Sequence, residues 1–355
     1  MGPSGRDSRG YNLLTEPQKM TNMNLTIGID LGGTSTRIGV FDAQLNLLGS
    51  RTMVTRVTAG PRSCVEEMAS VVRDLLEQAS FGAEDIIGIG IGSPGPINLR
   101  SGVLGLLPNL PGWDNFPLRD ALAAATGLPV VLESDANAAA VGEWKMGAGK
   151  SAGLDSMAMI TLGTGVGSGL ILNGQVWHGM SGMAGEIGHA TLESDGPLCS
   201  CGTRGCMELY TSAKGVLRLA KTIADSSECT PALRELIDDE EEPTTLQLVT
   251  LSEVAGDTAA KLVFRRMGRY LGQGVANLIN TLDLPMVIVG GGVAGAWPLF
   301  APSMFEAVQD YCIIYRLANP SDSEARETDR TFICPAELGA SAGLIGAALL
   351  PTLRA

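Results

Sequence analysis

Aromatic side chains, histidine and positive charge are all scarce in this sequence of 355 residues. Phe, Trp and Tyr make up 5% of the chain, and there are only two His. Asp and Glu number 38 against 25 Lys and Arg, which gives a formal net charge of −13 at pH 7. Because so acidic a chain does not neutralise phosphates in general, we expect no nucleic acid among its partners.

Long apolar runs are also missing. No stretch of about 18 consecutive apolar residues occurs, so the sequence predicts no transmembrane helix and no membrane partner. Residues 1–24 are polar and lack the apolar core of a signal peptide, so we expect a disordered leader, or a start codon placed too early, before Met20 or Met23. With no secretory signal and an odd number of Cys, seven, we expect no disulfides and a cytoplasmic protein.

Apolar residues and glycine, in contrast, are plentiful. Hydrophobic residues make up 45% of the chain and Gly contributes 46 residues, which favours an α/β protein with many tight turns. The length is that of two ordinary domains. A strand, a glycine turn and a second strand occur in residues 25–41 and again in residues 157–172. Such hairpins are not the strand-to-helix opening of a Rossmann unit, and their repetition suggests two related α/β domains.

The first glycine turn contains Asp30, Gly32, Gly33 and Thr34. Two Gly allow backbone N–H groups to approach a phosphate, and the Thr34 hydroxyl adds a donor. Asp30 could hold Mg²⁺ through water. An ordinary hairpin turn explains the same residues, so this motif alone is weak evidence.

Two further glycine motifs lie in the second half. Gly163, Thr164 and Gly165 begin a run of alternating glycines that would make a second phosphate cradle, so that the two turns could clamp one polyphosphate between the domains. Gly291, after a predicted strand, could lie flat against an adenine or ribose. A plain turn between strand and helix is an equally good explanation for Gly291.

Asp135 follows a predicted strand at residues 129–133 and precedes a predicted helix at residues 136–146. A carboxylate there could accept a proton from a hydroxyl during phosphoryl transfer. It could equally cap the helix, and the two roles are compatible.

A cluster of thiols follows in residues 185–208. One His and three Cys form the donor set of a tetrahedral zinc site, namely His189, Cys199, Cys201 and Cys206. Four protein ligands leave no open position, so the zinc would be structural; buried free thiols or a redox pair are the alternatives. Glu186 and Glu208 flank the cluster, either as solvated acids or as acceptors for sugar hydroxyls.

The order of these motifs resembles that of the ROK family of repressors, open reading frames and kinases. The similarity spans about residues 25–350. Its motifs are Asp30-x-Gly-Gly-Thr34, Pro94-Gly-Pro96, Pro108-Asn-Leu-x-Gly-Trp113, Asp135-Ala-Asn-Ala-Ala139, Gly163-Thr-Gly165, Gly185-Glu-x-Gly-His189 and Cys199-x-Cys-Gly-x-x-Gly-Cys-x-Glu208.

The resemblance implies an actin-like ATPase (ribonuclease H-like) fold, with two α/β domains and an interdomain active-site cleft. The first domain would span residues 25–135 and be completed by a C-terminal helix at about 339–355, and the second would span residues 136–338. The resemblance also implies ATP, Mg²⁺, a sugar substrate, structural Zn²⁺, and a homodimer or homotetramer.

Residue roles carry over position by position. Asp135 resembles the catalytic base, and Asn109, Glu186, His189 and Glu208 resemble sugar contacts, with His189 also on the zinc. The nucleotide contacts would be Asp30, Gly32, Gly33, Thr34, Gly163, Thr164, Gly165 and Gly291. Many family kinases have Asn directly before the catalytic Asp, where this chain has Ser134. A lost sugar hydrogen bond there would cost about 0.5–1.5 kcal/mol, which activity should survive.

The function implied is transfer of the ATP γ-phosphoryl group to a hexose hydroxyl, with glucose and its 6-hydroxyl first. Kinases for N-acetylmannosamine, N-acetylglucosamine, fructose or allose are alternatives within the family. A sugar-responsive repressor is a second class of function, but only 24 residues precede the first expected strand, which we consider too few for a helix-turn-helix domain. A catalytically silent sugar-binding scaffold is disfavoured by the intact Asp135.

Overall fold

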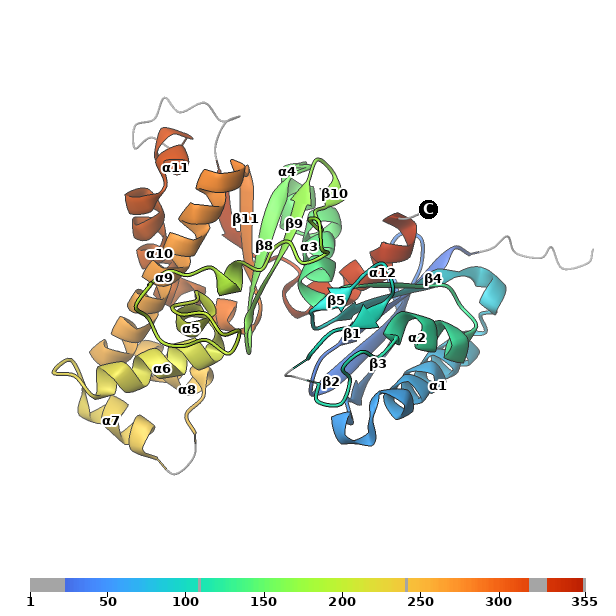
Figure 1. Cartoon of the computed structure of the whole chain (residues 1–355), viewed down its shortest axis with the longest axis horizontal. Helices are drawn as coiled ribbons and strands as arrows, with labels where there is room; N and C mark the ends of the chain where they lie inside the picture. Colours follow the sequence, from blue (N-terminus) through green and yellow to red (C-terminus); the bar gives the residue numbers. More distant parts are fainter. Residues whose placement is uncertain (1–22, 108–109, 240–241, 319–330, 354–355) are drawn as a thin grey trace, which may run out of the picture.

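The computed structural model describes residues 23–107, 110–239, 242–318 and 331–353, which form two α/β domains (Figure 1). The first domain has a five-stranded mixed sheet in the order β3-β2-β1-β4-β7. Its strands are β1 (Leu25–Leu31), β2 (Ser35–Phe41), β3 (Leu47–Val54), β4 (Ile86–Ser93) and β7 (Val130–Ser134). A small hairpin of β5 (Ile97–Asn98) and β6 (Val103–Leu104) projects beyond the end of β4.

Helices cover both faces of this sheet. Helices α1 (Pro61–Ala79) and α2 (Leu118–Thr126) pack together on one side, and α12 (Ala342–Leu353) crosses β1 and β4 on the other. The central strands are therefore buried on both faces, which explains their nearly continuous apolar sequence. Gly90 makes the α12 contact possible, because a Cβ there would lie 1.8 Å from the carbonyl oxygen of Ala347.

The second domain repeats this layout with the sheet order β10-β9-β8-β11-β12. Its strands are β8 (Met157–Leu162), β9 (Val166–Leu172), β10 (Gln175–Val176), β11 (Met286–Gly290) and β12 (Phe332–Pro335). Helix α3 (Asp135–Met146), followed by the short α4 (Ala148–Ala152), lies against β8 and β9. The remaining helices are α5 (Glu208–Thr211), α6 (Ala213–Ala224), α7 (Pro231–Asp238), α8 (Thr245–Glu253), α9 (Thr258–Leu282), α10 (Trp297–Tyr311) and α11 (Ile313–Ala318).

The chain passes between the domains twice, once from β7 into α3 and once from β12 into α12. The two helices that follow these crossings pack against each other between the sheets (Figure 1). A buried carboxylate, Glu143, fixes the second crossing to the end of α3. It accepts backbone N–H groups of Ala148 at 3.1 Å, Glu337 at 3.2 Å and Leu338 at 2.7 Å.

Several boundaries differ from the sequence pattern. The sequence of residues 115–126 predicts a helix from Asn115, but α2 begins at Leu118, because Asn115 has φ 59° and Pro117 precedes the first turn. The polar and acidic composition of residues 226–242 predicts a solvated insertion, but part of this stretch forms α7, which Thr230 caps and Leu233 anchors in the core. Strand β12 and helix α8 had no clear sequence signal. The predicted leader, except residues 23 and 24, lies outside the described residues.

No helix in the described part of the chain is both long enough and apolar enough to span a membrane.

Candidate active site

Asp135 lies where the first sheet ends and the second domain begins. Strand register aligns Asp30 of β1 with Gly92 of β4, and Ser93 of β4 with Ser134 of β7. The parallel strands therefore bring their carboxyl ends to one edge, where ligands of open α/β sheets bind.

The helix cap at this edge is Ser134, whose Oγ accepts the N–H of Asn137 at 3.1 Å. Asp135 is instead the first residue of α3, so the expectation that Asp135 caps the helix is wrong by one residue. Its Oδ1 accepts the N–H of the adjacent residue, Ala136, at 2.7 Å. Capping therefore does not account for a carboxylate at position 135.

The pKa of the Asp135 carboxylate is shifted by its surroundings. The Asp135 residue is exposed, but the protein packed around its carboxylate displaces much of the water there, and this desolvation raises its pKa to about 6. The N–H of Ala136 opposes the rise, while negative charge on Asp30 and Glu186 adds to it. The charge of one acidic residue from each domain thus acts on the Asp135 carboxylate.

The first glycine turn joins β1 to β2. The N–H of Gly32 donates to Ser35 O at 3.0 Å, and the Thr55 hydroxyl donates to Gly32 O at 2.8 Å. Gly33 is partly buried and Thr34 is exposed. The Asp30 carboxylate pairs through Oδ2 with Arg37 and lies against Gly343 of α12.

The second glycine turn joins β8 to β9 and closes with a 2.9 Å bond from Gly163 N–H to Gly165 O. Thr164 is exposed at its tip. Gly291 lies beside this turn, because β11 runs parallel to β8 and a Cβ on Gly291 would be 2.4 Å from Leu162 O. With φ 87°, Gly291 also adopts a conformation that L side chains rarely take. The structure thus brings the two predicted nucleotide motifs of the second domain, the turn at residues 163–165 and Gly291, to one sheet edge.

The four predicted zinc ligands converge. Their donor atoms all lie within 4.8 Å of one another, with Cys201 Sγ 3.6 Å from Cys206 Sγ and Cys199 Sγ 3.9 Å from His189 Nδ1. Tetrahedral zinc with Zn–S bonds of about 2.3 Å needs sulfur atoms about 3.8 Å apart. The donor set therefore fits a closed zinc site.

The thiol loop is also held from outside the cluster. The carboxylate of Glu193 accepts the Tyr210 hydroxyl at 2.9 Å and the Tyr270 hydroxyl at 2.6 Å, and the two rings stack with centroids 4.0 Å apart. Gly205, at φ 64°, lies so close to Glu193 O that a Cβ would be 1.7 Å away. These contacts tie the loop to α5 and α9.

The two flanking acids have different surroundings. Glu186 is exposed, and its Oε2 lies 4.0 Å from Nε2 of His189, the ring nitrogen that points away from Cys199. Glu208 accepts the N–H of Val166 at 2.9 Å and so joins the thiol loop to the second glycine turn. Asn109 lies outside the described residues.

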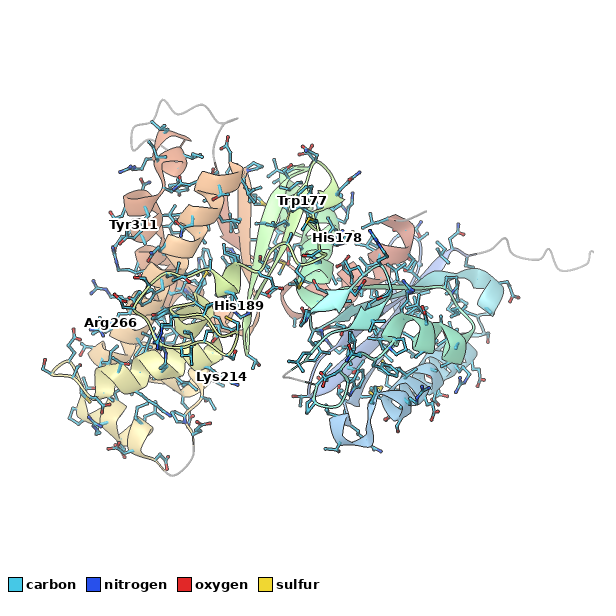
Figure 2. All side chains as sticks on the ribbon, viewed as in Figure 1. Trp177, His178, His189, Lys214, Arg266 and Tyr311 are labelled. Atoms are coloured by element: carbon cyan, nitrogen blue, oxygen red, sulfur yellow. The ribbon has the colours of Figure 1, made fainter. Side chains whose placement is uncertain are left out.

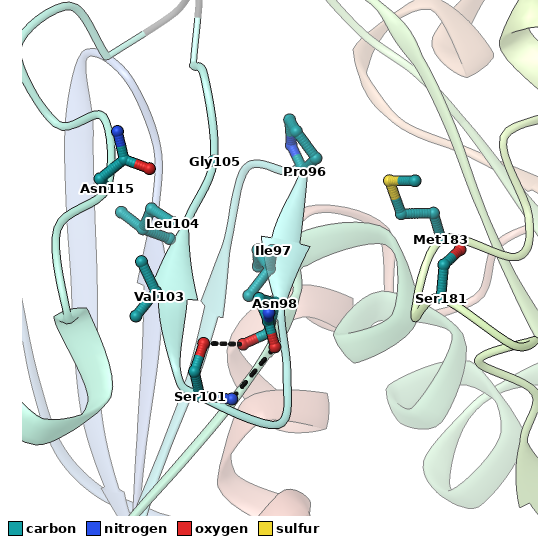
Figure 3. A pocket seen from close by; sticks show the side chains of 10 residues that line it. All are labelled: Pro96, Ile97, Asn98, Ser101, Val103, Leu104, Gly105, Asn115, Ser181 and Met183. Carbon is teal, nitrogen blue, oxygen red and sulfur yellow. Dashed lines mark hydrogen bonds between the residues drawn. The ribbon is translucent and has the colours of Figure 1, made fainter.

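A cavity of about 320 Å³ lies between the β5–β6 hairpin and the segment that carries Ser181 and Met183 (Figure 3). A neighbouring pocket is lined by Asn98 and Arg100 of the first domain and by His178 of the second. Both His residues, His178 and His189, lie on the side of the second domain that faces the first (Figure 2).

Two polar residues beside the site escaped the sequence reasoning. Glu133, buried in β7, pairs with His178 across the domain boundary at 2.7 Å. The sequence offered no motif that pairs these two residues, because they lie 45 positions apart. Only the scarcity of His in the chain could have drawn attention to His178.

Comparison with known proteins gives consistent results. The ROK family profile matches residues 26–352. The chain is 35% identical over 327 residues to a glucokinase of Streptomyces coelicolor, covering 92% of this chain and 97% of the relative. A ROK hexokinase structure from Thermus thermophilus has a TM-score of 0.74 and 35% identity, covering 93% and 98%. A Streptomyces griseus ROK glucokinase in complex with glucose and AMPPNP has a TM-score of 0.73 and 33% identity, covering 92% and 98%.

The chain therefore belongs to the ROK family, and the predicted family and two-domain α/β fold are confirmed. Membership alone does not define the activity, because a putative xylose repressor of a Caldicellulosiruptor species is 30% identical over 281 residues, covering 79% of this chain and 68% of the repressor. The choice between a kinase and a repressor therefore also depends on the residues around Asp135.

Proposed function

We propose that this protein is an ATP-dependent glucokinase that converts glucose to glucose 6-phosphate. The observation that carries the proposal is Asp135, a carboxylate free of the capping role, with its pKa raised to about 6 at the junction of the two domains. The glucokinase relative and the structure with glucose and AMPPNP support the choice of substrates.

Asp135 would act as general base for phosphoryl transfer. It accepts the proton of the sugar 6-hydroxyl while that oxygen forms its bond to the γ-phosphorus and the bond to the β-phosphate oxygen breaks, which releases ADP. A base with a pKa near 6 is ionised at neutral pH and yet basic enough to take the proton. The chain's own contribution is therefore orientation and proton acceptance.

The glycine turns would hold the nucleotide. Turn residues 33, 34, 164 and 165 would present backbone N–H groups, and Thr34 and Thr164 their exposed hydroxyls, to the phosphates. Gly32 and Gly163, whose N–H groups close the two turns, would shape them, and Gly291 would lie against the nucleoside. Bound Mg²⁺ would neutralise phosphate charge. Asp30 would hold it through water, since Arg37 pairs with only one of the Asp30 carboxylate oxygens.

Sugar hydroxyls would be bound by Ser134, Glu186, His189 and Glu208, together with Asn109. The zinc would be structural and would fix His189 through Nδ1, which leaves Nε2 for the sugar. The Ser134 hydroxyl already accepts a backbone N–H but keeps its own proton to donate.

We further propose a cytoplasmic homodimer or homotetramer, with no nucleic-acid or membrane partner. We also propose a first domain of residues 25–135, completed by the C-terminal helix at about 339–355, and a second domain of residues 136–338; the packing of α12 on β1 and β4 supports assigning that helix to the first domain.

A coupled assay of ADP release over a panel of hexoses and N-acetylhexosamines tests the function. We expect the highest kcat/KM with glucose. Higher values with N-acetylmannosamine or N-acetylglucosamine would assign the chain to another kinase of the family. Absence of ADP release with every sugar would refute the proposal.

The pH dependence of catalysis follows from Asp135. Protonation removes the base, so kcat/KM for glucose should fall about tenfold per pH unit below about pH 6 and level off above it. Initial rates between pH 5 and 8, at saturating ATP, measure this limb. A flat profile across that range would contradict the role of Asp135.

A further inference from the structure

Glu133 is the next-to-last residue of β7, just before the crossing, and is almost fully buried, at 2% exposure. Its Oε1 accepts the N–H of Ser134 at 3.0 Å and the side-chain amide of Asn137 at 2.9 Å. Its Oε2 pairs with Nε2 of His178 at 2.7 Å. Ser134 and Asn137 are close in sequence to Glu133, whereas His178 comes from the segment after β10 in the second domain.

A buried carboxylate is costly unless each oxygen has a partner. The local partners satisfy Oε1, and His178 satisfies Oε2 from across the domain boundary. Removal of His178 would leave a buried, negatively charged oxygen without this donor, and the carboxylate would have to move or admit water.

The position of the pair connects it to Asp135. Glu133 holds the backbone N–H of Ser134 and the side chain of Asn137, and Ser134 caps the helix by accepting the Asn137 N–H. Asp135 lies between these two anchored residues. A shift of the Glu133 carboxylate therefore moves both ends of the four-residue segment, residues 134–137, that carries Asp135.

The pair also lies beside the crossing from β7 to α3. His178 thus contacts, through Glu133, the segment where the chain enters α3.

We propose that His178 is a positioning residue for phosphoryl transfer: through Glu133 it fixes the first turn of α3 and with it the Asp135 carboxylate. The inference rests on the proposed kinase function. Misplacement of a reacting group by about 1 Å can cost up to about 100-fold in rate, so the expected effect is on kcat rather than on sugar affinity.

The test compares His178→Ala, His178→Gln, Glu133→Gln and the double variant His178→Ala/Glu133→Gln. Gln carries an amide nitrogen close to where His has Nε2, so it can keep the donor to Glu133. Gln175→Ala, an exposed residue of β10 three positions before His178, is the control. Measurements are kcat, KM for glucose and for ATP, the melting temperature, and amide hydrogen exchange of residues 134–140.

We expect kcat of His178→Ala to fall about tenfold, with both KM values within about twofold of wild type. His178→Gln should recover most of the rate. Glu133→Gln should also slow the reaction, and adding His178→Ala to it should cost less than about twofold more, because both changes break one contact. Exchange at residues 134–140 should speed up in His178→Ala and return toward wild type in His178→Gln.

Wild-type kcat in His178→Ala, or multiplied effects in the double variant, would refute the positioning role. A melting temperature lowered equally in both His178 variants, without rescue of kcat by Gln, would reduce the pair to a purely structural one. An inactive wild-type protein would instead refute the proposed function itself, so the two failures are distinguishable.

Discussion

Replacing Asp135 with Asn is expected to lower kcat by about 10²–10⁴-fold while glucose binding stays measurable. Asn keeps the size of the side chain and an oxygen that can accept the Ala136 N–H, as Asp135 Oδ1 does at 2.7 Å, but it cannot take a proton from the sugar. Loss of a positioned general base typically costs this much. Steady-state kinetics give kcat, and isothermal titration calorimetry gives the glucose affinity; Asp135→Ala should behave similarly.

The same variant should not be less stable at neutral pH. The unfolded carboxyl ionises at its ordinary pKa of 3.8, whereas in the folded protein the pKa is about 6. Ionisation therefore disfavours folding increasingly from pH 3.8 upward, and in full above about pH 6. Access of solvent to Asp135 reduces the size of this penalty. A neutral Asn removes it, so the melting temperature should stay equal or rise.

Asp239→Asn, an exposed carboxylate at the end of α7, is the matched control and should leave activity unchanged. Near-wild-type turnover in Asp135→Asn would rule out general-base catalysis by this residue. A large drop in melting temperature would attribute the lost activity to misfolding instead.

How much of this site the sequence predicts depends on how local each part is. The zinc ligands all fall between His189 and Cys206, so their spacing alone indicates a tetrahedral set, and the structure brings them together. The hairpin turns are local too, because each turn joins two antiparallel neighbours in the sheet.

Contacts between segments that lie far apart in the chain have no comparable signal in the sequence. The bond from Val166 N–H to Glu208 spans 42 residues and depends on the thiol loop folding back on β9. The pair of Glu133 and His178 depends on how the two domains meet. The start of α2 was misplaced for a different reason, since Asn115 adopts a positive φ that its residue type permits but does not require.

The second large effect is expected from the zinc site. Cys201→Ser should lose the one zinc ion per chain that we expect in the wild type, because a hydroxyl replaces a thiolate ligand. A coordinated metal ion deprotonates its thiol ligands, so Cys201 would bind zinc as the thiolate. Structural zinc contributes about 10–16 kcal/mol of apparent binding free energy in small peptides, so even part of that should destabilise the loop measurably.

The consequence for catalysis follows from what the loop carries. Glu186, His189 and Glu208 all lie on it, and Glu208 also holds the N–H of Val166 beside the second glycine turn. Loss of zinc should therefore raise KM for glucose by about tenfold or more, lower the melting temperature, and expose residues 193–204 to proteolysis.

Cys229→Ser is the control, because Cys229 is a partly buried thiol outside the cluster, and it should keep the zinc and the wild-type KM. Elemental analysis of protein purified without chelators measures the number of zinc ions per chain in the wild type and in both variants. Wild-type protein without zinc would refute the metal site. Zinc retained in Cys201→Ser at one ion per chain would show that the other three residues suffice, and Cys201 would then not be a required ligand. A variant that loses zinc yet keeps its melting temperature and KM would separate the metal from the sugar site, since the contacts of Glu193 with Tyr210 and Tyr270 would then be enough to hold the loop.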